Sequence, residues 1–196
     1  MWKLILKWLN SVNEEQEQEQ KPQSSWSKHA LDVAIEIIGW GEEGANNRGP
    51  KIDIIRRGRK LTKYQLGAWC ASTCSYEIEE GWARYHGAAN WEALPQKTRD
   101  LCPIKRTPSA SGLARRIAKV GTKVTEPLPG DFVLFKYKNN HHIAIVSKVE
   151  DDMWESIDGN RGSYNKKTGH GSKVRRYKHE HGEAAVVYFV RLPTNY

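Results

Sequence analysis

The chain lacks any long hydrophobic run. Hydrophobic residues make up 38% of its 196 positions and its mean hydropathy is −0.73, so no segment approaches the roughly 20 apolar residues of a membrane-spanning helix. Cysteine is scarce too: there are three, without the regular spacing of disulfide-stapled secreted domains. No two of them form the C-x-x-C pair that seeds a structural zinc site. We therefore expect a soluble protein with a free thiol and with neither metal nor cofactor.

Signatures of nucleic-acid-binding modules are missing as well, although the chain is basic. It carries 31 Lys and Arg against 23 Asp and Glu, a net charge of +8, and its pI is about 9.4. Such a charge favours an anionic partner, whether nucleic acid, acidic lipid or an anionic cell-wall polymer. Because the sequence has no aromatic RNA-binding signature, no zinc finger and no basic zipper, we expect no nucleic acid.

The first 24 residues differ in composition from the rest and are predicted to form a separate unit. Residues 1–12 predict an amphipathic helix, with apolar residues at helical spacing: Trp2, Ile5, Leu6 and Leu9. Lys7 interrupts the apolar stretch and no small-residue cleavage site follows, so we expect synthesis in the cytoplasm without a secretion signal. A polar run over residues 14–25 predicts a linker. The helix is expected to dock on the protein's own core, on a membrane surface or on a partner.

Residues 25–196 form the predicted folded domain, which divides into a helical half and a strand-rich half. Apolar spacing predicts helices over residues 26–38, 70–81 and 111–120. Gly81 is expected to end the second helix, and the glycines between residues 39 and 50 predict a loop. Polar turns then separate five predicted strands: residues 132–135, 143–149, 153–157, 173–177 and 185–192. Helices followed by an antiparallel meander predict an α+β fold.

Cys70 is the first candidate for a catalytic residue, because it opens the predicted second helix. The positive end of a helix dipole lowers the pKa of a thiol placed there, and a nearby imidazolium lowers it further. For the Trp69-Cys70 dipeptide alone, an inert buried thiol is the alternative interpretation. The histidine motif further along the chain favours a nucleophile instead.

His142 is the candidate base. It and His141 are neighbours in a predicted strand, so their side chains point to opposite faces. His142 shares its face with the small Ala144, which leaves space for a helix terminus to approach. A base needs an acceptor that holds its ring, and Asp158 or Asn160, two apart on an extended segment, could supply one. Both stay candidates, since Asp-Gly-Asn is also an ordinary turn sequence.

These motifs resemble those of the CHAP family, the cysteine- and histidine-dependent amidohydrolases and peptidases related to NlpC-type enzymes. The resemblance runs over residues 26–192 and rests on five segments: IGWGEEGANNRGPKI, AWCASTCSY, PLPGDFVLF, HHIAIV and SIDGN. It implies a papain-like catalytic domain in which Cys70 is the nucleophile and His142 the base. The third position then falls at Asp158 or Asn160.

The same resemblance implies that the substrate is bacterial peptidoglycan, cut at the muramoyl-alanine amide or within the stem or cross-bridge peptide. Gln65 or Tyr64 is a candidate side-chain donor to the oxyanion site. Some relatives carry an aspartate-rich calcium loop ahead of the cysteine. The region around Asp53 is basic in this chain, so we expect no calcium.

An enzyme of this kind without a secretion signal must reach the wall after lysis, through a pore or inside a particle. A bacteriophage endolysin or virion-associated lysin is therefore expected, with residues 1–12 as the candidate virion or membrane contact. Two alternatives stay open. One is an effector or toxin, a cysteine protease or deamidase acting on a host protein, and the other is a catalytically idle phage subunit that binds wall or builds the particle.

Overall fold

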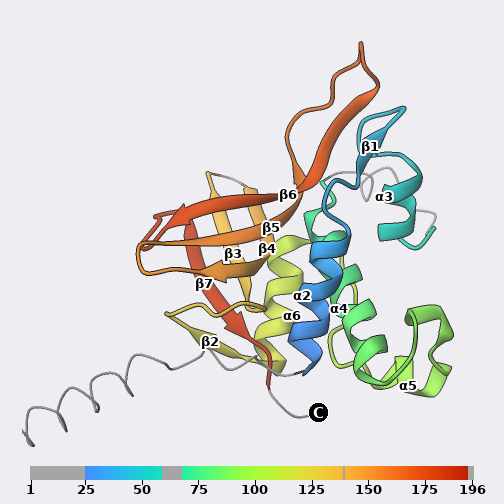
Figure 1. The fold of residues 1–196 in the computed structure, drawn as a ribbon, viewed down its shortest axis with the longest axis vertical. Helices are drawn as coiled ribbons and strands as arrows, with labels where there is room; N and C mark the ends of the chain where they lie inside the picture. The colour runs from blue at the N-terminus through green and yellow to red at the C-terminus, as the bar shows by residue number, and fades with distance from the viewer. Residues whose placement is uncertain (1–24, 59–67, 139, 194–196) are drawn as a thin grey trace, which may run out of the picture.

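Helices between residues 25 and 120 pack on a seven-stranded antiparallel sheet, and all its strands except the first follow these helices in the sequence (Figure 1). The computed structural model describes residues 25–58, 68–138 and 140–193, so the predicted helix and linker within residues 1–24 lie outside the described residues. The helical elements are α2 (Ser25–Glu36), α3 (Pro50–Ile55), α4 (Cys70–Tyr85), the 3-10 helix η2 (Trp91–Ala93), α5 (Gln96–Leu101) and α6 (Ala110–Val120). The coarse α+β prediction is confirmed.

The sheet has the strand order β1-β6-β5-β4-β3-β7-β2. Its strands are β1 (Gly41–Glu43), β2 (Thr122–Val124), β3 (Phe132–Tyr137), β4 (Asn140–Val149), β5 (Met153–Arg161), β6 (His170–Glu180) and β7 (Val186–Arg191). All five predicted strands are present. The sequence missed β1 and β2, because three residues are too few for a period-two pattern. Residues 158–160 lie inside β5 and not in a turn.

The sequence predicts that helix α4 ends at Gly81, and this prediction is wrong. The helix continues to Tyr85. A Cβ atom at Gly81 would lie 2.7 Å from the backbone nitrogen of Ala30 and 2.8 Å from its Cα. Glycine is therefore needed here for α2 to approach α4 closely. Trp26 of α2 fastens the contact, since its Nε1 donates to the carbonyl of Ile78 at 3.1 Å.

The predicted loop over residues 39–50 is also partly wrong, because the glycine-rich segment contains β1 and leads into α3. Gly41 pairs with Lys173 of β6, and a Cβ atom at Gly41 would lie 2.7 Å from the carbonyl oxygen of Ser172. The close pairing directs the side chain of Glu42 inward, where it is buried. The hairpin of β5 and β6 extends past the body of the protein beside β1 (Figure 1).

Alternate residues of the central strands supply two hydrophobic clusters. Ile143 and Ile145 of β4 belong to the larger cluster, which includes the buried faces of the helices. The residues between them belong to a smaller cluster formed by strands: Val133, Phe135, Ala144, Val146, Trp154 and Phe189. Each central strand is thus buried on both faces, as alternation in a covered sheet requires. Within the described ranges, no helix is long and apolar enough to cross a membrane.

Candidate active site

Cys70 is the first residue of α4, and the residue before it is held rigidly. Trp69 is fully buried, and its indole Nε1 donates to Glu42 Oε1 at 3.0 Å. The other oxygen of Glu42 accepts from the backbone N–H of Ser172 at 3.2 Å. Thr73 closes the first turn, since its hydroxyl donates to the Trp69 carbonyl at 3.1 Å. The thiol is therefore fixed at the positive end of the helix dipole, as the sequence predicted.

His142 meets both Cys70 and Asp158. Its Nε2 lies 2.8 Å from Asp158 Oδ2, and its ring is close enough to the Cys70 thiol for each group to shift the pKa of the other. Because Nε2 is occupied by the carboxylate, Nδ1 is the nitrogen left for the sulfur. His142 is buried whereas His141 is exposed, which agrees with their opposite orientations in β4. The structure thus brings together three of the four residues proposed as catalytic.

Asn160 is the fourth, and the structure does not bring it to the imidazole. The pairing of β5 with β6 shifts register between Asp158 and Arg161, and Asn160 has a left-handed φ of 62°. The prediction that the side chains of Asp158 and Asn160 share one face of a regular strand is therefore wrong. Among the described residues, no hydrogen bond joins Asn160 to His142, whereas Asp158 is fully buried beside the ring.

Gly159 explains how Asp158 reaches this position. A Cβ atom there would collide with the side chain of Thr73, lying 2.7 Å from its Cβ. Only glycine lets β5 approach the first turn of α4 so closely. The approach carries the neighbouring carboxylate to the end of the helix that holds Cys70.

Three donors converge on the Asp158 carboxylate. Oδ2 accepts from His142 and also from Arg161 Nε, each at 2.8 Å, and Oδ1 accepts from the hydroxyl of Ser156. Burial opposes the charge, but these contacts outweigh it and lower the pKa of Asp158. A buried carboxylate that stays ionised can hold an imidazolium beside it.

The electrostatics of the pair favour a thiolate and an imidazolium. Burial opposes charge on Cys70, but the hydrogen bond and the charge of His142, with backbone contacts from Ile143 and Ala71, lower the pKa of the thiol. Burial likewise opposes charge on His142, but hydrogen bonds with Asp158 and Cys70 raise its pKa to about 9. Both shifts favour the pair of a Cys70 thiolate and a His142 imidazolium, which is the activated form of a cysteine nucleophile.

The pKa values of the other two thiols are raised instead of lowered. Cys74 is fully buried one turn along α4, and burial together with the nearby Glu77 raises its pKa well above the usual value. Burial also raises the pKa of Cys102, to about 11. All three cysteines are free, so the structure singles out Cys70 as the reactive one.

Glu77 lies further along the same face of α4, and no local pattern in the sequence predicts its unusual state. It is fully buried, and among the described residues neither carboxyl oxygen has an N–H or O–H partner, so the thiol of Cys74 is the polar group beside it. Burial raises the pKa of Glu77 to about 8, and the charge of Asp158 contributes to the rise. The group is therefore a neutral carboxylic acid at neutral pH.

Replacing Glu77 by glutamine should stabilise the protein increasingly as the pH rises. The folded protein holds this proton up to pH about 8 whereas the unfolded chain loses it near 4.5, so wild-type stability falls as pH rises between these values. Glutamine does not titrate, and we expect Glu77→Gln to be more stable by about 2 kcal/mol at pH 8, with a smaller difference at pH 5. Urea unfolding at both pH values measures this.

Glu79 provides the matched control for that prediction. It is buried on the same helix but bonded to Arg57 and Arg106 at 2.6 Å, and although burial opposes the charge, hydrogen bonds and charge from Arg106 and then Arg57 lower its pKa. Glu79→Gln should therefore destabilise the protein. An equal effect of both substitutions at pH 8 would contradict the assignment of a neutral Glu77.

Gln65 and Tyr64, the candidate oxyanion donors, lie outside the described residues. A helix leaves its first N–H groups without an acceptor inside the helix, so the backbone N–H of Cys70 is a candidate donor to an oxyanion. No group of three or more His, Cys, Asp or Glu side chains in the described part of the chain is arranged to hold a metal ion.

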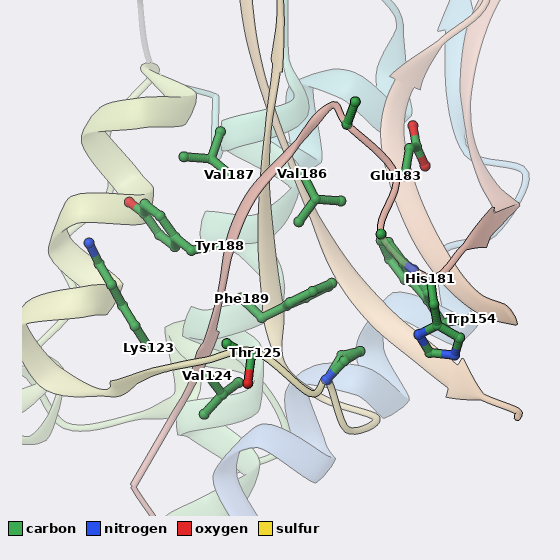
Figure 2. A pocket seen from close by; sticks show the side chains of 13 residues that line it. Lys123, Val124, Thr125, Trp154, His181, Glu183, Val186, Val187, Tyr188 and Phe189 are labelled. Atoms are coloured by element: carbon green, nitrogen blue, oxygen red, sulfur yellow. The ribbon is translucent and has the colours of Figure 1, made fainter. Parts of the chain in front are cut away.

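Two hollows lie near the strand-built cluster. Figure 2 shows the more apolar one, of about 500 Å³, lined by residues of β2 and β7 such as Val124, Val186 and Phe189, and by Trp154. None of its lining residues belongs to the Cys70 site. A second hollow of about 500 Å³ is lined by Arg161 and Tyr137, among others, and therefore borders the residues that contact Asp158.

Arg161 and Ser156 are the site residues that sequence reasoning missed. Ser156 stands two positions before Asp158 in a strand, so period-two alternation alone could have placed both on one face. Arg161 could not be found in this way, because the register shift that turns it back to Asp158 is set by the pairing with β6.

Comparisons with known proteins assign no family. No family profile matches the chain, and no curated protein matches it. A solved structure described as "The crystal structure of Ly7917" is similar, with a TM-score of 0.46 and 17% sequence identity. The similarity covers 86% of this chain, which spans 63% of the length of that one.

Proposed function

We propose that the protein is a cysteine hydrolase that cleaves amide bonds in bacterial peptidoglycan, with a papain-like CHAP domain as its catalytic unit. The observation that carries the chemistry is the buried contact of His142 with both the Cys70 thiol and Asp158 Oδ2. A thiol at a helix start, an imidazole and an ionised carboxylate, in this order of contact, are the parts of an acyl-transfer site.

The reaction begins with attack of the Cys70 thiolate on the amide carbonyl. A C–S bond forms, and the carbonyl electrons move to oxygen, where the N–H groups of the first helical turn stabilise the charge. His142 donates its proton to the leaving nitrogen as the C–N bond breaks, which leaves a thioester. Neutral His142 then removes a proton from water, the hydroxide displaces the sulfur, and the carboxylic acid product leaves with thiolate and imidazolium restored.

The choice of peptidoglycan as substrate rests on the resemblance of the sequence motifs and on charge. The net charge of +8 favours association with an anionic wall polymer. The same chemistry could serve an effector that cleaves or deamidates a host protein. An idle subunit is less well supported, because an activated thiol has no use in a protein that only binds.

Digestion of purified peptidoglycan tests the proposal. Mass analysis of the released fragments should reveal new amino groups, on the N-terminal alanine of the stem for an amidase or within the peptide for an endopeptidase. Wild-type protein that alkylates normally at Cys70 yet releases no fragment from several wall chemotypes would contradict a peptidoglycan substrate and would favour the effector alternative.

A chain that begins at Ser25 should keep the hydrolytic activity and lose any particle or membrane association. The first described helix starts at Ser25, and Trp26 already makes its contact with Ile78, whereas the preceding polar run offers little apolar surface to bury. Turnover of soluble wall fragments and vesicle co-sedimentation measure the two properties. If the shortened chain does not fold, residues 1–12 belong to the core and the docking interpretation is wrong.

A further inference from the structure

A chain of hydrogen bonds continues from Asp158 away from Cys70. The hydroxyl of Ser156, which donates to Asp158 Oδ1, lies 2.8 Å from His179 Nε2. The other ring nitrogen of His179, Nδ1, lies 2.7 Å from Glu183 Oε2. Ser156 and His179 are buried, whereas the Glu183 side chain is 32% exposed. The side chains of Ser156 and His179 thus connect Asp158 to the partly exposed carboxylate of Glu183.

Counting donors fixes the direction of the bonds between Asp158 and His179. The ionised Asp158 can only accept, so Ser156 must give its single proton to Asp158. The Ser156 oxygen then accepts from His179, which requires a proton on Nε2. On the other side of the ring, Nδ1 faces Glu183 Oε2.

Aromatic side chains hold the His179 ring in place. The ring stacks on Trp154 with centroids 4.1 Å apart and an interplanar angle of 18°, and its centroid lies 5.2 Å from that of Phe135. Such stacking fixes the orientation of a ring and therefore the direction in which its Nε2 points. The ionisable groups lining the hollow beside His179 are of both signs: Glu183, Glu180, Lys178, Arg161, His181, Tyr137 and Tyr177.

We propose that His179 is a positioning residue: by donating to Ser156 it commits the serine proton to Asp158 and holds that carboxylate toward His142. The inference rests on the proposed function only in taking Cys70 as the nucleophile. Without a donor at residue 179, the Ser156 proton is free to turn away from Asp158. The carboxylate then loses one of its three donors, stabilises the His142 imidazolium less well, and leaves a smaller fraction of Cys70 as thiolate.

Two substitutions of His179 separate this role from simple packing. A glutamine amide nitrogen reaches the place of Nε2 and can still donate to Ser156, whereas that of asparagine reaches only the place of Nδ1. Both variants lose the stacked ring. We expect His179→Gln to keep Cys70 alkylation by iodoacetamide near its wild-type rate at about pH 6, and His179→Asn to slow it about three- to tenfold.

Ser156→Ala provides a second variant that removes no ring, and it should resemble His179→Asn. In both slow variants, the pH above which Cys70 is alkylated should rise. The pH at which His142 loses its proton, seen as the alkaline step in the profile of alkylation rate against pH, should fall. Equal rates in the glutamine and asparagine variants, or an unchanged Ser156→Ala, would overturn the proposal. Alkylation needs no substrate, so failure of these variants is distinguishable from a wild-type protein that does not digest peptidoglycan.

Discussion

Cys70→Ala should abolish hydrolysis, lowering kcat/KM by at least about 10³-fold, because a methyl group cannot form the acyl intermediate. The fold should survive, since alanine fits the volume of the thiol and all neighbours of Cys70 remain. Release of fragments from peptidoglycan measures the activity, and thermal unfolding checks the fold. Wall-degrading activity in a folded Cys70→Ala protein would end the cysteine-hydrolase proposal.

Cys74→Ala is the matched control for that substitution. Cys74 lies one turn further along the same helix and is also buried. Burial and the nearby Glu77 raise the pKa of its thiol, whereas His142 lowers the pKa of the Cys70 thiol. The control should retain activity within a few-fold while losing a comparable buried sulfur. A similar loss in both variants would mean that damage to α4, and not removal of the nucleophile, explains the result.

Asp158→Ala should have the second largest effect, a loss of about 10²-fold in kcat/KM, because the His142 imidazolium loses its buried counter-ion. Asp158→Asn keeps an oxygen acceptor for the ring and should recover part of that loss. Asn160→Ala should keep kcat/KM within about threefold of wild type, because Asn160 makes no hydrogen bond to His142 among the described residues. Steady-state kinetics on soluble wall fragments compares the three.

Unfolding measurements must accompany the Asp158 variants, because Arg161 loses its buried partner at the same time. A correctly folded Asp158→Ala with full activity would remove Asp158 from the mechanism. A large loss in Asn160→Ala would restore the candidate that the geometry disfavours.

The nucleophile and the base could be predicted from sequence because their chemistry is local. Cys70 opens a helix whose start follows from the apolar pattern, and adjacent His141 and His142 must point to opposite faces of a strand. The choice between Asp158 and Asn160 was not local. It depends on a left-handed residue and on a register shift between β5 and β6, both of which are set by tertiary pairing.

The same distinction accounts for the errors in the fold. Glycine commonly ends helices, so the sequence predicts a stop at Gly81, although this residue lies at a helix crossing where Ala30 leaves no room for a side chain. Contacts between distant segments were equally hidden. His179 lies 23 positions from Ser156, and nothing in the local sequence marks it as part of the site.

The central claim, that one activated thiol performs the hydrolysis, is tested most directly by titrating that thiol. Limiting iodoacetamide near pH 6 is added to native protein, and the labelled fraction of each cysteine is mapped alongside residual activity on peptidoglycan. We predict that Cys70 is labelled first, that activity falls in proportion to its labelling and reaches zero when it is complete, and that His142→Ala slows the labelling. Activity that persists with Cys70 fully labelled, or that follows Cys74 or Cys102 instead, would contradict the account.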